Sequence, residues 1–394
     1  MSLSVTIWDG QADKTREVIM ALDRRSFVKW SAASLLTLSG AVALGGCGGG
    51  ADASAGAAPG GGAGEAGGSA AAGGGEISIF IWSEYLPQEI LDAFRDATGN
   101  TVNMVTFTST ADMYAKVISS PEGSFDLVDA DGIYVKRLID EGYLEPLDFA
   151  NIPNFKNMGA GFLGQYFDPE NTYSVPYMGG TAPLCYNAAT CPVPIRGYDD
   201  LFDPALANSL VLLSDFRVIM GSINKMLGFD FNETDTTKLA QTEAKLMELK
   251  PNVKLLDSDS PKTAIINGDC VAGLMYSAEV AIAMSEVPDV QVVFPEQGQY
   301  KFQDNLVIAK GTKNKQLCEE FLNYLMEPDV SALISQVFPY TNPNTAALEL
   351  LGSEYTDNPA INPPQSALDK GSETLDLPSD VLDLYNDIWT RFTQ

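Results

Sequence analysis

The sequence contains no histidine, and only five of its 394 residues are cysteine. Without histidine, a Ser-His-Asp or Cys-His catalytic site, an HExxH metalloprotease helix and most zinc sites are excluded. A GxSxG turn, a GxxxxGK[ST] phosphate loop and a CxxC pair are also absent from the sequence. An enzyme that works through paired carboxylates is still compatible with this composition, although it would have no local signature. We therefore expect neither a metal nor a cofactor.

Basic residues are scarce, since 24 Lys and Arg stand against 52 Asp and Glu and give a net charge of −28. Such a field repels nucleic acid and anionic lipid and attracts cations, so we expect no nucleic-acid partner. Acidity that only keeps an extracellular protein soluble is an equally good explanation of the charge. After residue 47, no apolar run is long enough to cross a bilayer.

The first 47 residues carry the pattern of an exported and lipid-anchored protein. Arg24-Arg25 precedes an uncharged run over residues 30–46, and this run ends in Leu-Gly-Gly before Cys47. The segment resembles a twin-arginine export signal joined to a lipoprotein cleavage site. We predict a signal over residues 1–46 and lipidation of Cys47. The alternative is a short transmembrane anchor, but a glycine-containing run of 17 residues is short for a span.

The segment that follows is built almost entirely from Gly and Ala. Residues 47–75 show no apolar periodicity and predict a flexible linker with a reach of roughly 30 Å. The remaining residues suffice for two domains with their own cores. We thus expect an extracytoplasmic protein, in a periplasmic space or at a cell surface, anchored to the membrane by lipid.

Four cysteines follow the predicted lipidation site, at Cys185, Cys191, Cys270 and Cys318. An even number in an oxidising compartment predicts one or two disulfides. Cys185 and Cys191 are close enough in sequence to staple a local loop, but the sequence does not settle the pairing.

The body of the chain begins with alternating strands and helices. Apolar runs predict strands at residues 77–82, 101–108 and 125–128, with helices after Leu86-Pro87 and around residues 114–119. This rhythm predicts an α/β fold with a parallel sheet. A last helix, expected to serve packing only, is indicated by the pattern around residues 381–388.

Ligands of such sheets bind beyond the carboxyl ends of the strands. Trp82-Ser83-Glu84-Tyr85 and Asp129-Ala130-Asp131 follow two of the predicted strands. A purely structural role of Trp82, as a core aromatic, is the alternative.

Eight segments, in order, resemble the polyamine-binding proteins of ABC importers, the spermidine/putrescine periplasmic type. The segments are 81–87, 113–116, 126–128, 173–177, 251–253, 257–259, 304–308 and 343–347. The resemblance implies a two-lobed periplasmic-binding-protein-like fold (type II), in which each lobe is a mostly parallel sheet flanked by helices. It further implies a monomer that is not an enzyme and that passes its solute to an ABC permease.

The same resemblance implies where the lobes lie along the chain. Lobe 1 would hold residues 76–181 with 279–309, and lobe 2 would hold residues 184–276 with 312–394. The ligand would lie in the cleft between them, where it favours the closed state.

A polyamine needs carboxylates for its ammonium groups and aromatic faces for its methylenes and charges, each aromatic contact contributing about 0.5–2 kcal/mol. Enclosure by both lobes would strengthen the ion pairs. The candidate ligand-binding residues are Trp82, Ser83, Glu84, Tyr85, Asp131, Asp215, Tyr276, Glu279, Phe302, Asp304 and Tyr340.

Two departures from the family pattern bear on the ligand. Val218 stands where spermidine and putrescine binders place a second carboxylate, and Ile133 stands near a position where spermidine binders have tyrosine. Asp131 falls where the family usually has serine, and we hypothesise that it restores the missing negative charge from the opposite lobe. The alternative is that Asp131 is a solvated loop acid or a helix cap and that the site takes a smaller monocation.

Three functions therefore stay open. The first is delivery of putrescine or spermidine to an ABC importer. The second is the same fold with another solute, such as a cationic amino acid derivative, a thiamine-like cation or a sugar. The third is not transport at all, but a carboxylate-pair hydrolase or a tethered ligand sensor.

Overall fold

The computed structural model describes residues 74–394. The predicted signal at 1–46, the lipidation site Cys47 and all but the end of the predicted linker lie outside the described residues. Residues Gly75–Phe94 and Thr101–Gln394 group into one compact unit.

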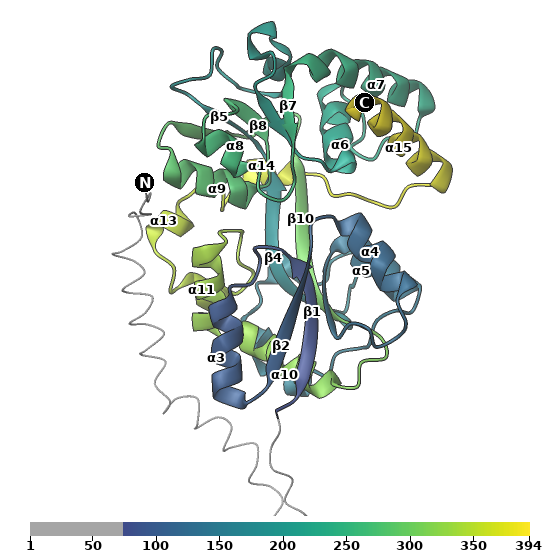
Figure 1. Ribbon diagram of the computed structural model, residues 1–394, viewed down its shortest axis with the longest axis vertical. Helices are drawn as coiled ribbons and strands as arrows, with labels where there is room; N and C mark the ends of the chain where they lie inside the picture. The colour runs from purple at the N-terminus through teal and green to yellow at the C-terminus, as the bar shows by residue number, and fades with distance from the viewer. Residues whose placement is uncertain (1–73) are drawn as a thin grey trace, which may run out of the picture. The chain divides into compact units, whose positions relative to one another are not determined.

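Ten strands of the described chain form two mixed five-stranded sheets (Figure 1). The strands are β1 (Glu76–Trp82), β2 (Thr101–Phe107), β3 (Leu127–Asp131), β4 (Ser174–Ala182), β5 (Leu184–Asn187), β6 (Leu210–Leu212), β7 (Val253–Leu256), β8 (Ala272–Leu274), β9 (Val290–Val293) and β10 (Tyr300–Ile308). The first sheet has the order β2-β1-β3-β10-β4 and the second β7-β6-β8-β5-β9. In each sheet four strands run in the same direction, and the fifth, β10 or β5, is antiparallel to both of its neighbours. The predicted α/β fold with two helix-flanked sheets is confirmed.

Helices cover both faces of each sheet. They are α3 (Gln88–Thr98), α4 (Thr110–Ser119), α5 (Gly132–Asp140), α6 (Phe216–Met226), α7 (Thr236–Leu249), α8 (Lys262–Ile266), α9 (Ser277–Glu286), α10 (Lys315–Leu325), α11 (Pro328–Val337), α12 (Thr345–Leu348), α13 (Ser353–Thr356), α14 (Gln365–Asp369) and α15 (Ser379–Thr393). On one side of the first sheet, α4 and α5 touch through Tyr114 and Tyr134. On the other side, Phe94 of α3 contacts Phe321 of α10.

The first strands follow the sequence pattern, with one shift that concerns the site. β1 buries the apolar run that predicted it, and α3 ends before Gly99, whose φ of 76° suits only glycine readily. The third strand lies two residues later than predicted, so Asp129 and Asp131 belong to β3 itself rather than to the loop after it. Since Asp is disfavoured in strands, the apolar pattern ended the predicted strand too early.

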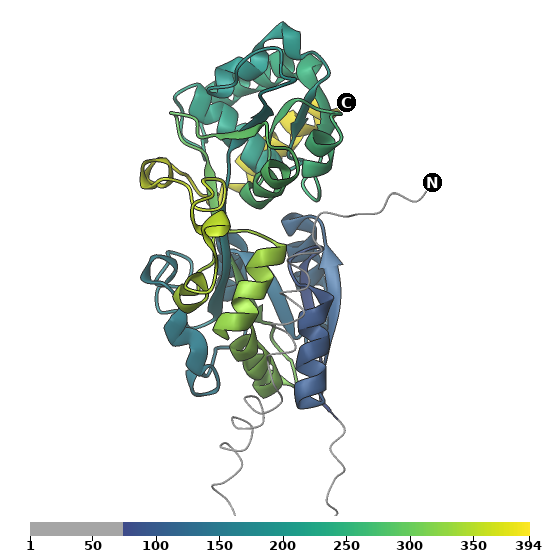
Figure 2. The ribbon, with the colours of Figure 1, turned by 90° about the vertical axis from the view of Figure 1, so that its left-hand side faces the viewer.

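Two segments lie with the other sheet from the one predicted. β9, placed in lobe 1 by the prediction of 279–309, pairs with β5 in the second sheet. α10, placed in lobe 2 by the prediction of 312–394, packs beside α3 (Figure 2). The Tyr324 hydroxyl donates to the Ile90 carbonyl at 3.2 Å. The chain therefore returns to the first sheet between β9 and β10 rather than at residue 279. The other lobe boundaries stay predictions.

The predicted disulfides are absent, since Cys185, Cys191, Cys270 and Cys318 are all free thiols in the described chain. Cys185 belongs to the hydrophobic cluster on one face of the second sheet, whereas Cys191 packs against the cluster on the other face. The sheet therefore separates the two thiols that sequence spacing had brought closest.

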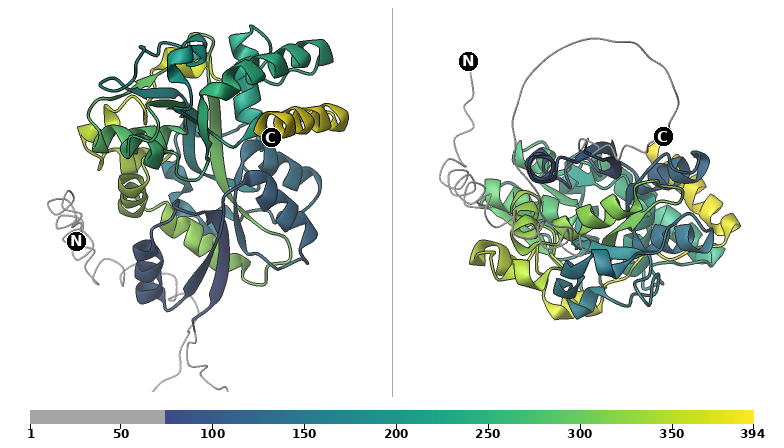
Figure 3. Two further views of the ribbon diagram at one scale, coloured as in Figure 1. Left: turned by 45° about the horizontal axis from the view of Figure 1, so that its top comes forward. Right: turned by 90° about the horizontal axis from the view of Figure 1, so that it is seen from below.

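α15, which the sequence pattern predicted as a packing helix, covers the second sheet. It lies against α6 and α7 (Figure 3). Tyr385 is buried, and its hydroxyl donates to the Glu233 carbonyl at 2.9 Å and accepts from Asn224 Nδ2 at 3.1 Å. Between residues 74 and 394, none of the helices has the length and apolarity that a bilayer span requires.

Candidate ligand-binding site

Three carboxylates emerge on the same face of the first sheet. Asp129 and Asp131 are two residues apart on β3, so their side chains point the same way. Asp304 of β10 pairs directly with Asp131 across the antiparallel ladder and therefore shares its face. All three side chains are buried. The pairing of β3 with β10 thus gathers three acids from two distant parts of the chain.

Their burial keeps these acids from ionising normally. Burial raises the pKa of Asp129 well above its usual range, and the charges of Asp304 and Asp131 raise it further. The pKa of Asp304 is likewise well raised, by burial and by Asp131. Neither carboxylate oxygen of Asp129 has a partner of good hydrogen-bond geometry among the described residues, although the Trp82 backbone N–H lies near enough to lower its pKa in part. Among the described residues no ammonium or guanidinium group pairs with these three acids, so a bound cation would favour their ionised form.

Asp131 accepts more hydrogen bonds than either of the other two carboxylates. It caps α5 by accepting from the backbone N–H groups of Ile133 and Tyr134, and the Tyr300 hydroxyl donates to it at 3.3 Å. Burial raises its pKa to about 6, although these hydrogen bonds act in the opposite direction. Asp131 is thus a helix cap, as one alternative predicted, but it is buried and not a solvated loop acid. The cap does not neutralise its charge.

A wall of aromatic rings stands beside the acids. Tyr300, Phe302 and Asp304 alternate on one face of β10, and the first two rings stack at 5.7 Å. Phe302 also meets Tyr276 and Tyr340 edge to face, at 5.6 and 5.4 Å. Such rings offer apolar surface together with a negative face that attracts cations.

Tyr85, from the loop after β1, joins the wall to the acids. Its hydroxyl donates to Asp304 at 3.0 Å, and its ring lies 5.6 Å from that of Tyr340. The Tyr177 hydroxyl donates to the Tyr85 carbonyl at 2.7 Å and fixes this loop against β4. Trp82, half-buried at the end of β1, contacts Tyr85 at 6.1 Å.

The second sheet contributes an acid at the start of α6. Asp215 caps this helix by accepting from the backbone N–H groups of Arg217 and Val218. The Tyr276 hydroxyl donates to its other oxygen at 3.4 Å. Asp215 and Asp131 are close enough for the charge of Asp215 to raise the pKa of Asp131. Asp131 of the first sheet therefore lies near Asp215 of the second. Val218, which stands where the family has a second carboxylate, is buried in the hydrophobic core of the second sheet.

Loops from both sheets meet at another edge of the site. Ser83 donates to Asp259 at 2.6 Å, and the Lys262 ammonium lies 2.8 Å from Glu84 and 2.9 Å from Glu279. Glu279 is almost completely buried, and burial raises its pKa to about 7 although Lys262 lowers it. The interactions after β1 therefore tie the first sheet to the loop that begins α8.

These groups enclose a pocket between the loop after β1 and the second sheet. It is lined by Trp82, Ser83, Glu84, Tyr85, Ser258, Asp259, Tyr276, Glu279, Phe338 and Tyr340. Seven of the predicted site residues line it. Asp215, Phe302 and Asp304 adjoin it through contacts with Tyr276, Tyr340 and Tyr85, which line it. Asp131 lies one contact further away, since its partner Tyr300 does not line the pocket but stacks on Phe302.

The sequence pattern missed several residues of this site. Tyr300 could have been found, because it shares the alternation of Phe302 and Asp304. Asp129 stood in the segment expected at a strand end but was not chosen. Asp259 and Tyr177 lie in two of the segments that resemble the family, 257–259 and 173–177, and could have been chosen from them. Lys262 carries no local signal, since long-range folding brings it to the site.

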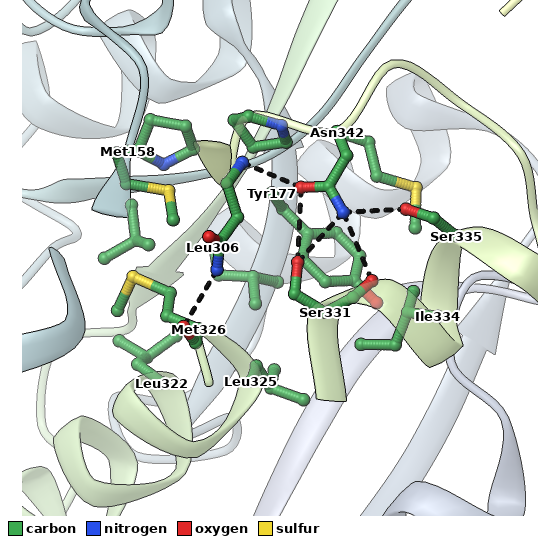
Figure 4. A pocket seen from close by; sticks show the side chains of 15 residues that line it. Met158, Tyr177, Leu306, Leu322, Leu325, Met326, Ser331, Ile334, Ser335 and Asn342 are labelled. Carbon is green, nitrogen blue, oxygen red and sulfur yellow. Dashed lines mark hydrogen bonds between the residues drawn. The ribbon is translucent and has the colours of Figure 1, made fainter. Parts of the chain in front are cut away.

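A second pocket has a different character (Figure 4). Met158, Leu306, Leu322 and further apolar side chains line it. Its amide, Asn342, is occupied within the protein, since Nδ2 donates to the hydroxyls of Ser331 and Ser335 at 3.0 and 2.8 Å. This pocket offers no free charge to a cation and is a feature of packing. Within residues 74–394, no group of three or more acidic or thiol side chains is arranged to hold a metal ion.

The sequence matches the model of one protein family, described as bacterial extracellular solute-binding protein, over residues 89–363. A spermidine/putrescine-binding periplasmic protein of Salmonella typhimurium is 32% identical over 291 residues, which cover 74% of this chain and 84% of that protein. The putrescine-binding periplasmic protein PotF of Escherichia coli is 28% identical over 308 residues, covering 73% and 83%.

Solved structures agree with these matches. A Listeria monocytogenes protein described as a spermidine/putrescine ABC transporter superposes with a TM-score of 0.77 at 29% identity, covering 81% of this chain and 99% of that chain. The spermidine/putrescine ABC transporter substrate-binding protein PotD of Streptococcus pneumoniae gives a TM-score of 0.70 at 28% identity, covering 81% and 98%.

Proposed function

We propose that this chain, which belongs to the family of bacterial extracellular solute-binding proteins, captures a polyamine, putrescine or spermidine, and delivers it to the permease of an ABC transporter. The proposed ligand class is that of its relatives, among them the Salmonella typhimurium spermidine/putrescine-binding protein. The proteins of this family are binding proteins rather than enzymes. The hydrolase alternative is therefore set aside.

One observation carries the proposal, the buried acidic cluster without a cation. Asp129, Asp131 and Asp304 lie out of water on one sheet face, and aromatic rings stand beside them. Unpaired buried carboxylates are costly, and a bound cation removes that cost. An extended polyamine supplies ammonium groups for the acids and methylenes for the rings.

In this proposal the two sheets share the ligand. Asp304 and Asp129 would hold one ammonium group from the first sheet, and Asp131 together with Asp215 would hold another between the sheets. Trp82, Tyr85, Tyr276, Phe302 and Tyr340 would pack along the methylenes. Since the ligand would contact both sheets, it would stabilise the closed arrangement that a permease recognises.

The remaining features belong to the same proposal. The protein would act as a monomer outside the cytoplasm, attached to the membrane through lipidated Cys47. Transport and ligand sensing differ in what the bound form contacts, so polyamine uptake by cells with and without the gene distinguishes them. Loss of uptake supports transport, and unchanged uptake supports a sensor.

Thermal unfolding of the purified protein with a panel of ligands tests the ligand class. The panel holds putrescine, cadaverine, spermidine, spermine, lysine, arginine and thiamine. A ligand at a hundred times its Kd adds about 2.7 kcal/mol of stability, which raises the Tm by several degrees. A rise with polyamines supports the proposal. A rise with thiamine or an amino acid alone favours the second function named above.

A further inference from the structure

Lys262, the first residue of α8, places its ammonium among acceptors of the site. Its Nζ lies 2.8 Å from Glu84 Oε2, 2.9 and 3.2 Å from the two oxygens of Glu279, and 3.1 Å from Ser260 Oγ. An ammonium has three protons to donate, and three residues accept here. The side chain is 14% exposed and that of Glu279 only 2%. This is a fully coordinated, nearly buried ammonium.

The acceptors of Lys262 are walls of the candidate pocket. Glu84 and Glu279 line it together with Trp82, Tyr276 and Tyr340. Tyr340 lies within the electrostatic reach of both Glu279 and Asp304. The Glu84–Glu279 pair and the cluster of Asp129, Asp131 and Asp304 are therefore neighbouring acidic positions flanking one aromatic wall.

The two acidic positions differ in one respect, their occupancy by a cation of the protein. At Glu84 and Glu279 the alkyl stem and ammonium of Lys262 reproduce the chemistry of an amine ligand. Asp129 has no hydrogen-bond partner among the described residues, and the partners of Asp304 and Asp131 are neutral hydroxyl and amide groups. A ligand ammonium therefore meets carboxyl groups without a protein cation at the aspartates and an already paired charge at the glutamates.

We propose that Lys262 is a specificity-determining residue, a tethered ammonium that fills one cation position of the site and so limits the ligand to a diamine. This inference rests on the proposed function and goes beyond it by choosing between its two candidate ligands. The two ammonium groups of a diamine are matched by the four aspartates. The third ammonium of a triamine finds its carboxylates occupied.

The test replaces Lys262 by methionine, which keeps an apolar stem and removes the charge. Titration calorimetry measures the affinities of the wild-type protein and of Lys262→Met for putrescine and spermidine. The wild-type protein binds putrescine more tightly. In Lys262→Met the ratio of spermidine to putrescine affinity rises at least tenfold, because Glu84 and Glu279 become free to bind the third ammonium.

Lys254→Met is the matched control. Lys254 lies on β7 of the same sheet, half-exposed, and pairs with Asp269 at 3.4 Å, outside the pocket. The Lys254→Met variant has the same change in net charge as Lys262→Met, and its ratio of spermidine to putrescine affinity stays at the wild-type value. A second control is the double variant Lys262→Met/Glu279→Gln, which loses most of the gain if the vacated carboxylate binds the third ammonium. The Tm of each unliganded variant shows that it is folded, and Lys262→Arg restores the wild-type preference.

The outcomes separate this inference from the proposed function. Polyamine binding with an unchanged ratio in Lys262→Met overturns the role of Lys262 and leaves the proposed function standing. A wild-type protein that prefers spermidine overturns it as well. If the wild-type protein and all variants bind no polyamine, the proposed function falls and the inference falls with it.

Discussion

The buried carboxylate of Asp131 is expected to have opposite effects on the stability of the unliganded protein and on its affinity for a cation. Its buried carboxylate disfavours the folded state without ligand, and the same charge attracts a cation. Asp131→Asn keeps the cap of α5, because asparagine caps helices as well as aspartate does. At pH 8 we expect the unliganded variant to be more stable than the wild type by about 2–3 kcal/mol, given the wild-type pKa of about 6.

The same variant should bind putrescine about ten- to a hundredfold more weakly, because a charge-assisted hydrogen bond is lost. Urea unfolding gives the first quantity and calorimetry the second. Unchanged affinity for every polyamine would reduce Asp131 to a helix cap and end the hypothesis that it replaces the missing family carboxylate.

The raised pKa of Asp131 also predicts how stability depends on pH. The pKa of an aspartate in an unfolded chain is about 3.9. Between about pH 4 and pH 6 the folded protein therefore binds more protons than the unfolded chain. The stability that the raised pKa of Asp131 contributes is fully present below the unfolded pKa and is lost as the pH rises through the folded pKa of about 6. Glu279, with its pKa raised to about 7, acts in the same direction.

Calorimetric melting of the unliganded protein between pH 5 and pH 8 checks this. We expect the Tm to fall as the pH rises, and to fall less in Asp131→Asn. Since self-repulsion of the acidic surface also weakens the protein at higher pH, the difference between the two proteins is the informative quantity. Parallel curves would mean that Asp131 ionises normally.

At the scale of elements, the ladder between β4 and β10 shapes the aromatic wall. Gly180 of β4 pairs with Phe302 of β10, and a Cβ at Gly180 would lie 2.5 Å from Phe302 Cζ and 3.0 Å from Tyr340 Cδ1. Gly180→Ala must therefore move both rings. We expect a loss of about 1–3 kcal/mol in stability from the overpacking and weaker polyamine binding.

Gly197→Ala is the matched control, because no heavy atom would lie within 4 Å of its Cβ and its φ of −173° suits any residue. Urea unfolding and calorimetry compare the two variants. If Gly180→Ala bound polyamines as tightly as Gly197→Ala does, the rings of Phe302 and Tyr340 would have no part in the site.

Elements also show where the sequence pattern reached its limit. The strands β1 and β2 and the helices α3 and α15 were predictable, because apolar periodicity and a glycine end marked them. β3 was predicted, but its end was placed three residues too early, because its last residues include two acids that an apolar pattern does not mark as strand. The position of α10 was missed for another reason, since periodicity reveals an apolar face but not the sheet that this face covers.

At the scale of the whole molecule, the site depends on contacts between distant segments. Asp304 meets Asp131 through strand pairing across 173 residues, and Lys262 meets Glu84 across 178. The family resemblance supplied seven of the ten residues that line the pocket. It could not supply Lys262 or the unpaired state of Asp129, because both depend on the environment of this particular fold.

The central claim is that buried, partly protonated carboxylates await a cation. Titration calorimetry of the purified protein with putrescine near pH 6.5, in buffers of different ionisation enthalpy, tests it most directly, because the buffer dependence of the heat counts the protons exchanged. We predict binding of one ligand per chain with release of protons, since a cation lowers the pKa of the acids it meets. Absence of binding, or binding without proton release, would contradict the claim.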